Sequence, residues 1–191
     1  MTLLILGLGN DLLGDDAVGL RVAERVGLER LPGVETVQSS AAGLYLIDLI
    51  EGQDDAIVID SLPGDPVGSV LELDLRKFAR VAPSAHYAGL PEALRMAEDA
   101  GTKVPRRVAV VAVTIRDAQT VGAAMDPAVE AAIPKAASIV RRIAGAWGYA
   151  PSGPAAEPEA AHRRSGADSA ATRKDRHDRA ESPSRSPARP R

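Results

Sequence analysis

The chain has 191 residues, of which 26% are charged, and it carries a formal net charge of −3 and no cysteine. The lack of cysteine excludes disulfides, thiolate metal sites and thiol nucleophiles. No apolar segment is long enough to span a bilayer and no basic signal-peptide start precedes the first apolar run, so we expect a soluble, cytoplasmic protein without a membrane partner.

The composition changes at residue 151. From Pro151 onward Pro, Ser, Ala, Arg and Asp dominate without apolar periodicity, which predicts a disordered tail over residues 151–191. The tail has nine basic and six acidic residues, a net of +3, which leaves −6 for residues 1–150. Because the tail's charges are interleaved, they indicate a solvated segment rather than a nucleic-acid arm. We therefore expect one folded domain over residues 1–150 and no nucleic-acid partner.

The chain opens with a strand, a glycine turn and a helix. Leu3 to Leu6 is a continuous apolar run, as a parallel strand buried on both faces requires. The turn Gly7-Leu8-Gly9-Asn10 follows, and apolar periodicity then predicts an amphipathic helix from Asp16 to about Leu31. Asp15 is the expected N-cap of this helix, because a carboxylate accepts hydrogen bonds from free helical amides.

Strands and helices continue to alternate along the chain. The pattern predicts a strand over Val34–Ser39, a short helix over Leu44–Glu51, a buried strand over Asp55–Asp60, a loop over Ser61–Gly68 and an edge strand over Ser69–Asp74. It then predicts a helix over Leu90–Ala100, a strand over Arg107–Val113 and a helix that starts at Asp126-Pro127, runs towards Trp147 and is disturbed at Pro134. We expect an α/β three-layer sandwich with a mostly parallel sheet of roughly five strands and helices on both faces.

Three side chains from different loops are candidates for chemistry. Asp16 starts a helix, Asp60 closes a buried strand, and His86 is the sole histidine of the expected domain. Because ligands of parallel sheets bind at the carboxyl edge, we expect these side chains to meet there. Two carboxylates and an imidazole suit a divalent metal such as zinc or nickel. The same set suits general acid–base catalysis, so both types of site remain open.

The glycine turn has a second interpretation as the start of a dinucleotide fingerprint. Gly7 and Gly9 fit G-x-G-x-x-G, but Leu12 occupies the third glycine position. The adjacent Asp15 and Asp16 would repel a pyrophosphate at the helix start. We therefore expect no nucleotide cofactor.

These motifs together are similar to those of a known family. Gly7-Leu8-Gly9-Asn10, Leu12-Leu13 and Asp15–Gly19 resemble the amino-terminal signature of the hydrogenase maturation proteases. The likeness covers almost all of residues 1–148 and none of the tail, and it continues in Ile57–Asp60, Pro66–Gly68, His86–Leu90 and Met125–Glu130. The family's endopeptidases remove a carboxy-terminal extension from the large-subunit precursor of nickel–iron hydrogenases after nickel insertion.

The resemblance implies roles for five residues. The family's metal-contacting and catalytic triad falls on Asp16, Asp60 and His86, and its substrate-binding loops fall on Asn10 and Gly43. The nickel would be supplied by the precursor and would serve as the recognition handle. Whether metal or carboxylate activates the attacking water stays open. Some members have a glutamate in place of Asp16, and only Gly43 is retained of a turn that is rich in glycine and threonine.

Two alternatives use the same features. A nickel-sensing chaperone would bind the precursor at the same site without cleaving it. The peptidyl-tRNA hydrolases also end their first strand in Gly-Leu-Gly-Asn, but they continue with Pro-Gly and a His-Asn pair. Here Asp11 follows and no histidine precedes His86. The acidic net charge of residues 1–150 also disfavours an RNA substrate.

Overall fold

The computed structural model describes residues 1–74, 90–116 and 121–149, all within one unit of the chain that spans Met1–Ala155. The predicted tail over residues 151–191 lies outside the described residues, as does His86. The segment 117–120 after the last predicted strand is also outside them.

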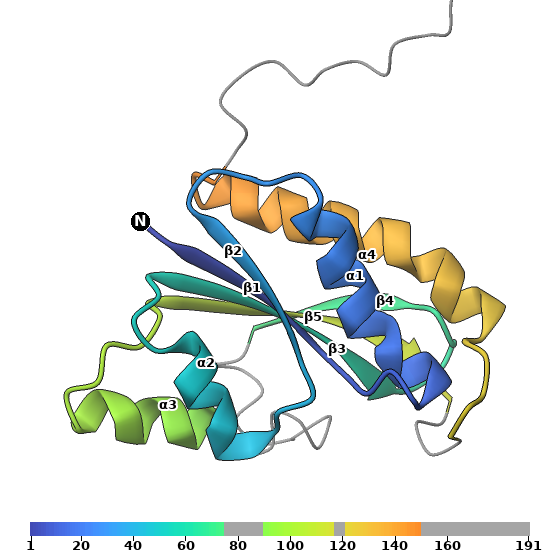
Figure 1. The fold of residues 1–191 in the computed structure, drawn as a ribbon, viewed down its shortest axis with the longest axis horizontal. Helices are drawn as coiled ribbons and strands as arrows, with labels where there is room; N and C mark the ends of the chain where they lie inside the picture. The colour runs from blue at the N-terminus through green and yellow to red at the C-terminus, as the bar shows by residue number, and fades with distance from the viewer. Residues whose placement is uncertain (75–89, 117–120, 150–191) are drawn as a thin grey trace, which may run out of the picture. The chain divides into compact units, whose positions relative to one another are not determined.

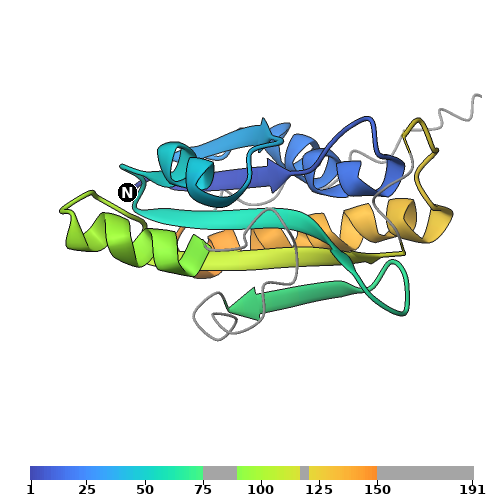
Figure 2. The same cartoon turned by 90° about the horizontal axis from the view of Figure 1, so that it is seen from below.

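Five strands form one sheet in the order β2-β1-β3-β5-β4 (Figure 1). The pairs β1–β2, β1–β3 and β3–β5 are parallel, and β4 alone runs antiparallel to its neighbour (Figure 2). This order confirms the predicted mostly parallel sheet and the predicted edge strand. The strands are β1 (Leu3–Leu8), β2 (Val34–Ser39), β3 (Asp55–Pro63), β4 (Val70–Asp74) and β5 (Arg107–Ile115).

Helices cover both faces of the sheet, as predicted. The helices α1 (Val18–Gly27) and α4 (Pro127–Ala146) lie on one face, and α2 (Leu46–Ile50) and α3 (Leu90–Asp99) lie on the other (Figure 1). The strand β1 supplies alternate side chains to two apolar clusters, one against α1 and α4 and the other against α2 and α3. Successive side chains of a strand point to opposite faces, which is why its continuous apolar sequence is buried throughout.

Several element boundaries differ from the prediction, and two of the differences lie near the expected site. The first helix is preceded by a 3₁₀ turn, η1 (Gly14–Ala17), and ends at Gly27 rather than near Leu31. The strand β3 continues three residues past Asp60, so the predicted loop over Ser61–Gly68 is wrong for its first three residues. The reason is tertiary: β5 pairs with β3 as far as Pro63, which extends the strand.

The start of α4 confirms the predicted cap. The Asp126 side chain accepts a 2.8 Å hydrogen bond from the Ala128 amide, and Pro127 occupies the first turn. The helix is continuous across Pro134, so the predicted disturbance does not interrupt it. Buried Ala132 and Ala136 on either side of Pro134 hold the helix against the sheet. Among the described helices, none has the length and apolar composition that crossing a membrane requires.

An ion pair between the partly exposed Arg107 and the buried Asp55 lies at the amino edge of the sheet, opposite the expected site. Arg107 donates to both carboxylate oxygens of Asp55, at 2.7 and 2.5 Å, and the Tyr149 hydroxyl donates to Asp55 Oδ2 at 2.8 Å. The hydrogen bond from Arg107 lowers the pKa of the fully buried Asp55, against the opposing effect of burial. Burial, followed by the hydrogen bond to Asp55, raises the pKa of Tyr149 to about 12. The cluster joins the starts of β3 and β5 to the residues after α4.

Candidate active site

The candidate site lies at the carboxyl edge of the sheet, where β1 stops before its neighbour. Pairing between β1 and β3 ends at Gly7 and Ile59, while β3 continues to pair with β5 as far as Pro63. Asp60 is therefore the first residue of β3 beyond β1. The sequence predicted that Asp60 ends the strand, whereas the strand continues to Pro63. Asp60 nevertheless lies where the pairing of β3 with β1 ends.

Asp16 joins the turn after β1 to the extended part of β3. Its Oδ2 accepts a 2.9 Å hydrogen bond from the Asn10 amide, and its Oδ1 accepts a 2.6 Å hydrogen bond from the Ser61 hydroxyl. The Asn10 side chain in turn accepts a 3.0 Å hydrogen bond from the Leu12 amide, which closes the turn locally. The Asp16 side chain is therefore held in one orientation, with only 5% of the residue exposed.

The Asp60 side chain lies on the face of the sheet opposite to that of Ser61. The odd-numbered residues of β3 pack with α1 and α4, and Ser61 is on their face of the sheet. The even-numbered residues face α2 and α3, so Asp60 points to that side. Asp60 is fully buried, and its Oδ1 accepts a 2.8 Å hydrogen bond from the Ser61 amide. Ser61 thus contacts Asp16 through its hydroxyl and Asp60 through its amide. The sequence analysis missed Ser61 because it assigned this residue to a loop.

Asp15 has a different role from the predicted one. Neither η1 nor α1 has a side-chain N-cap, because the Val18 amide that Asp15 would cap already donates to the Asp15 backbone carbonyl. The Asp15 carboxylate instead accepts a 2.6 Å hydrogen bond from the Asp126 amide. Asp15 therefore connects the start of α1 to the start of α4, and its prediction as the cap of the first helix was wrong.

The glycine turn allows the chain after β1 to approach β1 and β3 closely. A Cβ on Gly9, where φ is +147°, would lie 2.0 Å from the Asp16 carbonyl oxygen. A Cβ on Gly19 would lie 2.2 Å from the carbonyl oxygen of Leu8 and 2.6 Å from that of Ile59. No side chain fits at either position. Gly9, which resembled part of a phosphate-binding fingerprint, therefore allows the backbone of Asp16 to pack against the turn after β1, and Gly19 allows α1 to pack against β1 and β3.

Of the five predicted site residues, Asp16 and Asn10 are directly hydrogen-bonded, and Asp60 precedes Ser61, which donates to Asp16. Ser61 bonds Asp16 through its hydroxyl and Asp60 through its amide, whereas the Asp60 side chain lies on the opposite face of the sheet. Gly43 follows β2 at the same edge and begins a 3₁₀ turn, η2 (Gly43–Tyr45), with φ of +59°. His86 lies outside the described residues, so its place in the site stays a prediction. Within the described ranges, no group of three or more histidine, aspartate or glutamate side chains is arranged to hold a metal.

The chain matches one family of known proteins. The family model described as HycI, hydrogenase maturation protease, matches residues 21–143. This range is more than half of the chain and includes Asp60, whereas Asp16 lies just before it.

Curated and solved relatives agree with the family match. The hydrogenase expression/formation protein HupD of Rhizobium leguminosarum bv. viciae is 28% identical over 172 residues, which cover 84% of each chain. The structure of the hydrogenase maturating endopeptidase HybD from E. coli is 27% identical with a TM-score of 0.65, and the match covers 78% of this chain and 94% of HybD. A solution structure of an endopeptidase from Escherichia coli is 28% identical with a TM-score of 0.66, covering 78% and 95%. This chain belongs to the hydrogenase maturation protease family and has the α/β fold of its endopeptidases.

Proposed function

We propose that this endopeptidase removes the carboxy-terminal extension of a nickel–iron hydrogenase large-subunit precursor after nickel insertion, and that Asp16, Asp60 and His86 contact the nickel of the precursor. The nickel is then part of the substrate. The observation that supports this most directly is the 2.6 Å hydrogen bond from Ser61 to Asp16, which fixes Asp16 beside the residue that follows Asp60 at the carboxyl edge of the sheet.

The hydrogen bonding of Asp16 is compatible with a further ligand. From the residues that the structure describes, each of its carboxylate oxygens accepts one hydrogen bond, and a carboxylate oxygen has two lone pairs. Carboxylate and imidazole are donors that borderline divalent metals accept. Because Asp16 is already held in one rotamer, contact with the nickel would cost it little further side-chain entropy.

Cleavage requires water to add to the scissile carbonyl carbon and the departing nitrogen to gain a proton. A carboxylate of the site can take the proton from that water and pass it on as the carbon–nitrogen bond breaks. The nickel of the precursor can instead polarise the water or the carbonyl. Both routes fit the arrangement of Asp16 and Asp60 at the edge of the sheet.

The proposal is tested by incubating the protein with nickel-loaded and nickel-free precursor and by following loss of the extension by mass spectrometry. We expect cleavage of the loaded precursor only. The Asp60→Asn variant should cleave it at least about 100-fold more slowly, because it keeps the shape of the side chain but removes the proton acceptor and charge. Asp48→Asn, at an exposed position in α2, is the matched control and should leave the rate unchanged.

Three results would contradict parts of the proposal. Equal cleavage of both precursor forms would exclude nickel as the recognition handle. An unchanged rate for Asp60→Asn would remove Asp60 from the site. Tight binding of the loaded precursor without any cleavage would instead indicate the nickel-sensing chaperone.

A further inference from the structure

The strand β2 forms one edge of the sheet and pairs only with β1 among the described strands. The Leu3 amide donates to the Gly33 carbonyl at 2.9 Å, and the Gly9 amide donates to the Ser39 carbonyl at 3.2 Å. In a parallel pair, these two hydrogen bonds mean that the amides and carbonyls of the odd-numbered residues of β2 point toward β1. The amides and carbonyls of Thr36 and Gln38 therefore point away from the sheet. They form a row of two donors and two acceptors along its outer edge.

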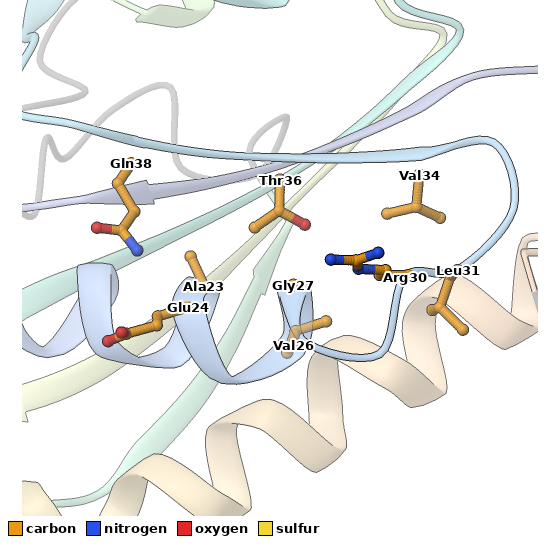
Figure 3. A pocket seen from close by; sticks show the side chains of 9 residues that line it. All are labelled: Ala23, Glu24, Val26, Gly27, Arg30, Leu31, Val34, Thr36 and Gln38. Carbon is orange, nitrogen blue, oxygen red and sulfur yellow. The ribbon is translucent and has the colours of Figure 1, made fainter.

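A groove of about 420 Å³ runs beside this edge, between β2 and α1. Figure 3 shows Val34, Thr36 and Gln38 pointing from β2 toward α1, and all three line the groove. Arg30 lies at the end nearest Val34, with a positive φ of +46°. Among the described residues, Arg30 makes no ion pair, whereas the neighbouring Glu29 is paired with Arg141. The groove therefore offers a cation at the end remote from the candidate site.

We propose that the outer edge of β2 binds the carboxy-terminal extension of the precursor as an added antiparallel strand, with a carboxylate of the extension at Arg30. This inference rests on the proposed function. An added strand satisfies open backbone groups, and the groove accepts every second side chain of the strand. Because Arg30 makes no ion pair with the described residues, its charge favours an acidic residue or the chain-terminal carboxylate.

The position of β2 in the sheet explains why we assign its outer edge to the carboxy-terminal extension. Its carboxyl end is bonded to Gly9, the residue before Asn10, so a strand on β2 reaches the edge where Asp16 lies. If the scissile peptide lies at that edge, the residues after it can run back along β2 toward Arg30. Natural edge strands are commonly blocked by proline, lysine or a bulge. The strand β2 has none of these, and its register with β1 is unbroken over six residues.

The test compares Gln38→Pro with Gln38→Ala, using nickel-loaded precursor as the substrate. Proline removes the outward amide of residue 38, whereas alanine removes the side chain and keeps that amide. Because this amide takes no part in the pairing with β1, both variants should melt close to the wild type. We expect Gln38→Pro to raise KM at least about fivefold, the effect of one lost hydrogen bond, with kcat unchanged. Gln38→Ala keeps this amide and loses only a side chain that lines the groove, so its KM should rise less than that of Gln38→Pro.

A second measurement separates this inference from the proposed function. A synthetic peptide with the sequence of the extension, labelled for fluorescence anisotropy, reports binding without any cleavage. We expect Gln38→Pro and Arg30→Gln to weaken binding of the peptide. Arg30→Gln should also reduce the loss of affinity that added salt causes in the wild type.

Several outcomes would overturn the inference. One is an equal KM for the proline and alanine variants, and another is peptide binding that neither Gln38→Pro nor Arg30→Gln changes. A wild-type dimer in solution that Gln38→Pro converts to monomers would assign the edge to a second copy of this chain. If the wild type fails to cleave the precursor but the peptide binds at β2, the proposed function is wrong and the β2 site stands.

Discussion

The Gly9→Ala variant is expected to lose about 3 kcal/mol of unfolding free energy and most of its cleavage activity. The added methyl group would lie 2.0 Å from the Asp16 carbonyl oxygen, so the backbone of Asp16 must move. Overpacking of this kind costs about 1–3 kcal/mol, and a φ of +147° adds strain for any residue with a Cβ. Because Asp16 bonds both Asn10 and Ser61, its displacement should disturb the site as well as the fold.

Gly52→Ala provides the matched control for this prediction. Gly52 also has a positive φ, +75°, but a Cβ there would have no atom within 4 Å. It should therefore show only the backbone strain, about 1 kcal/mol, with unchanged cleavage. Urea unfolding of both variants, with a cleavage assay at a temperature where both are folded, measures the difference. An equal loss of stability in the two variants would show that the contact between Gly9 and Asp16 is unimportant.

The Arg107→Ala variant is expected to lose about 3 kcal/mol of stability, because it leaves a buried carboxylate without its cation. Asp55 is fully buried, and Arg107 holds both of its oxygens. The exposed pair Arg21–Glu24 is the control, since both side chains are more than half exposed. Arg21→Ala should cost less than about 1 kcal/mol. Similar losses for the two variants in denaturant unfolding would contradict the importance of the pair between Arg107 and the buried Asp55.

This cluster also predicts how stability depends on pH. The pKa of Asp55 is lowered in the folded protein, so its contribution is fully present above the unfolded value of about 3.9 and is lost as pH falls through the folded pKa. The pKa of Tyr149 is raised to about 12, so its contribution is present below the unfolded value of about 10 and is lost as pH rises toward 12. When the unfolding free energy is measured against pH, Asp55→Asn should lose less stability at acidic pH than the wild type. Tyr149→Phe should lose less stability at alkaline pH than the wild type.

Much of the fold could be predicted because the signals are local. The apolar runs of β1, β3 and β5 indicate strands buried on both faces, and the Asp126-Pro127 pair indicates a helix start. Strand ends were less predictable because they depend on a partner. The strand β3 extends to Pro63 because β5 is still beside it, and nothing within the segment after Asp60 indicates this.

The sequence by itself determined the order of strands and helices, the family resemblance and the placement of acidic residues after β1 and near the end of β3. These features depend on periodicity and residue type within short segments. The tertiary structure decided which groups those acids bind. Asp16 is hydrogen-bonded to Ser61, which lies 45 residues further along the chain, and Asp15 to the amide of Asp126, which lies 111 residues further along. It also showed that Gly9 and Gly19 allow close packing of the backbone. Such contacts form only when distant segments fold together, so no local pattern in the chain encodes them.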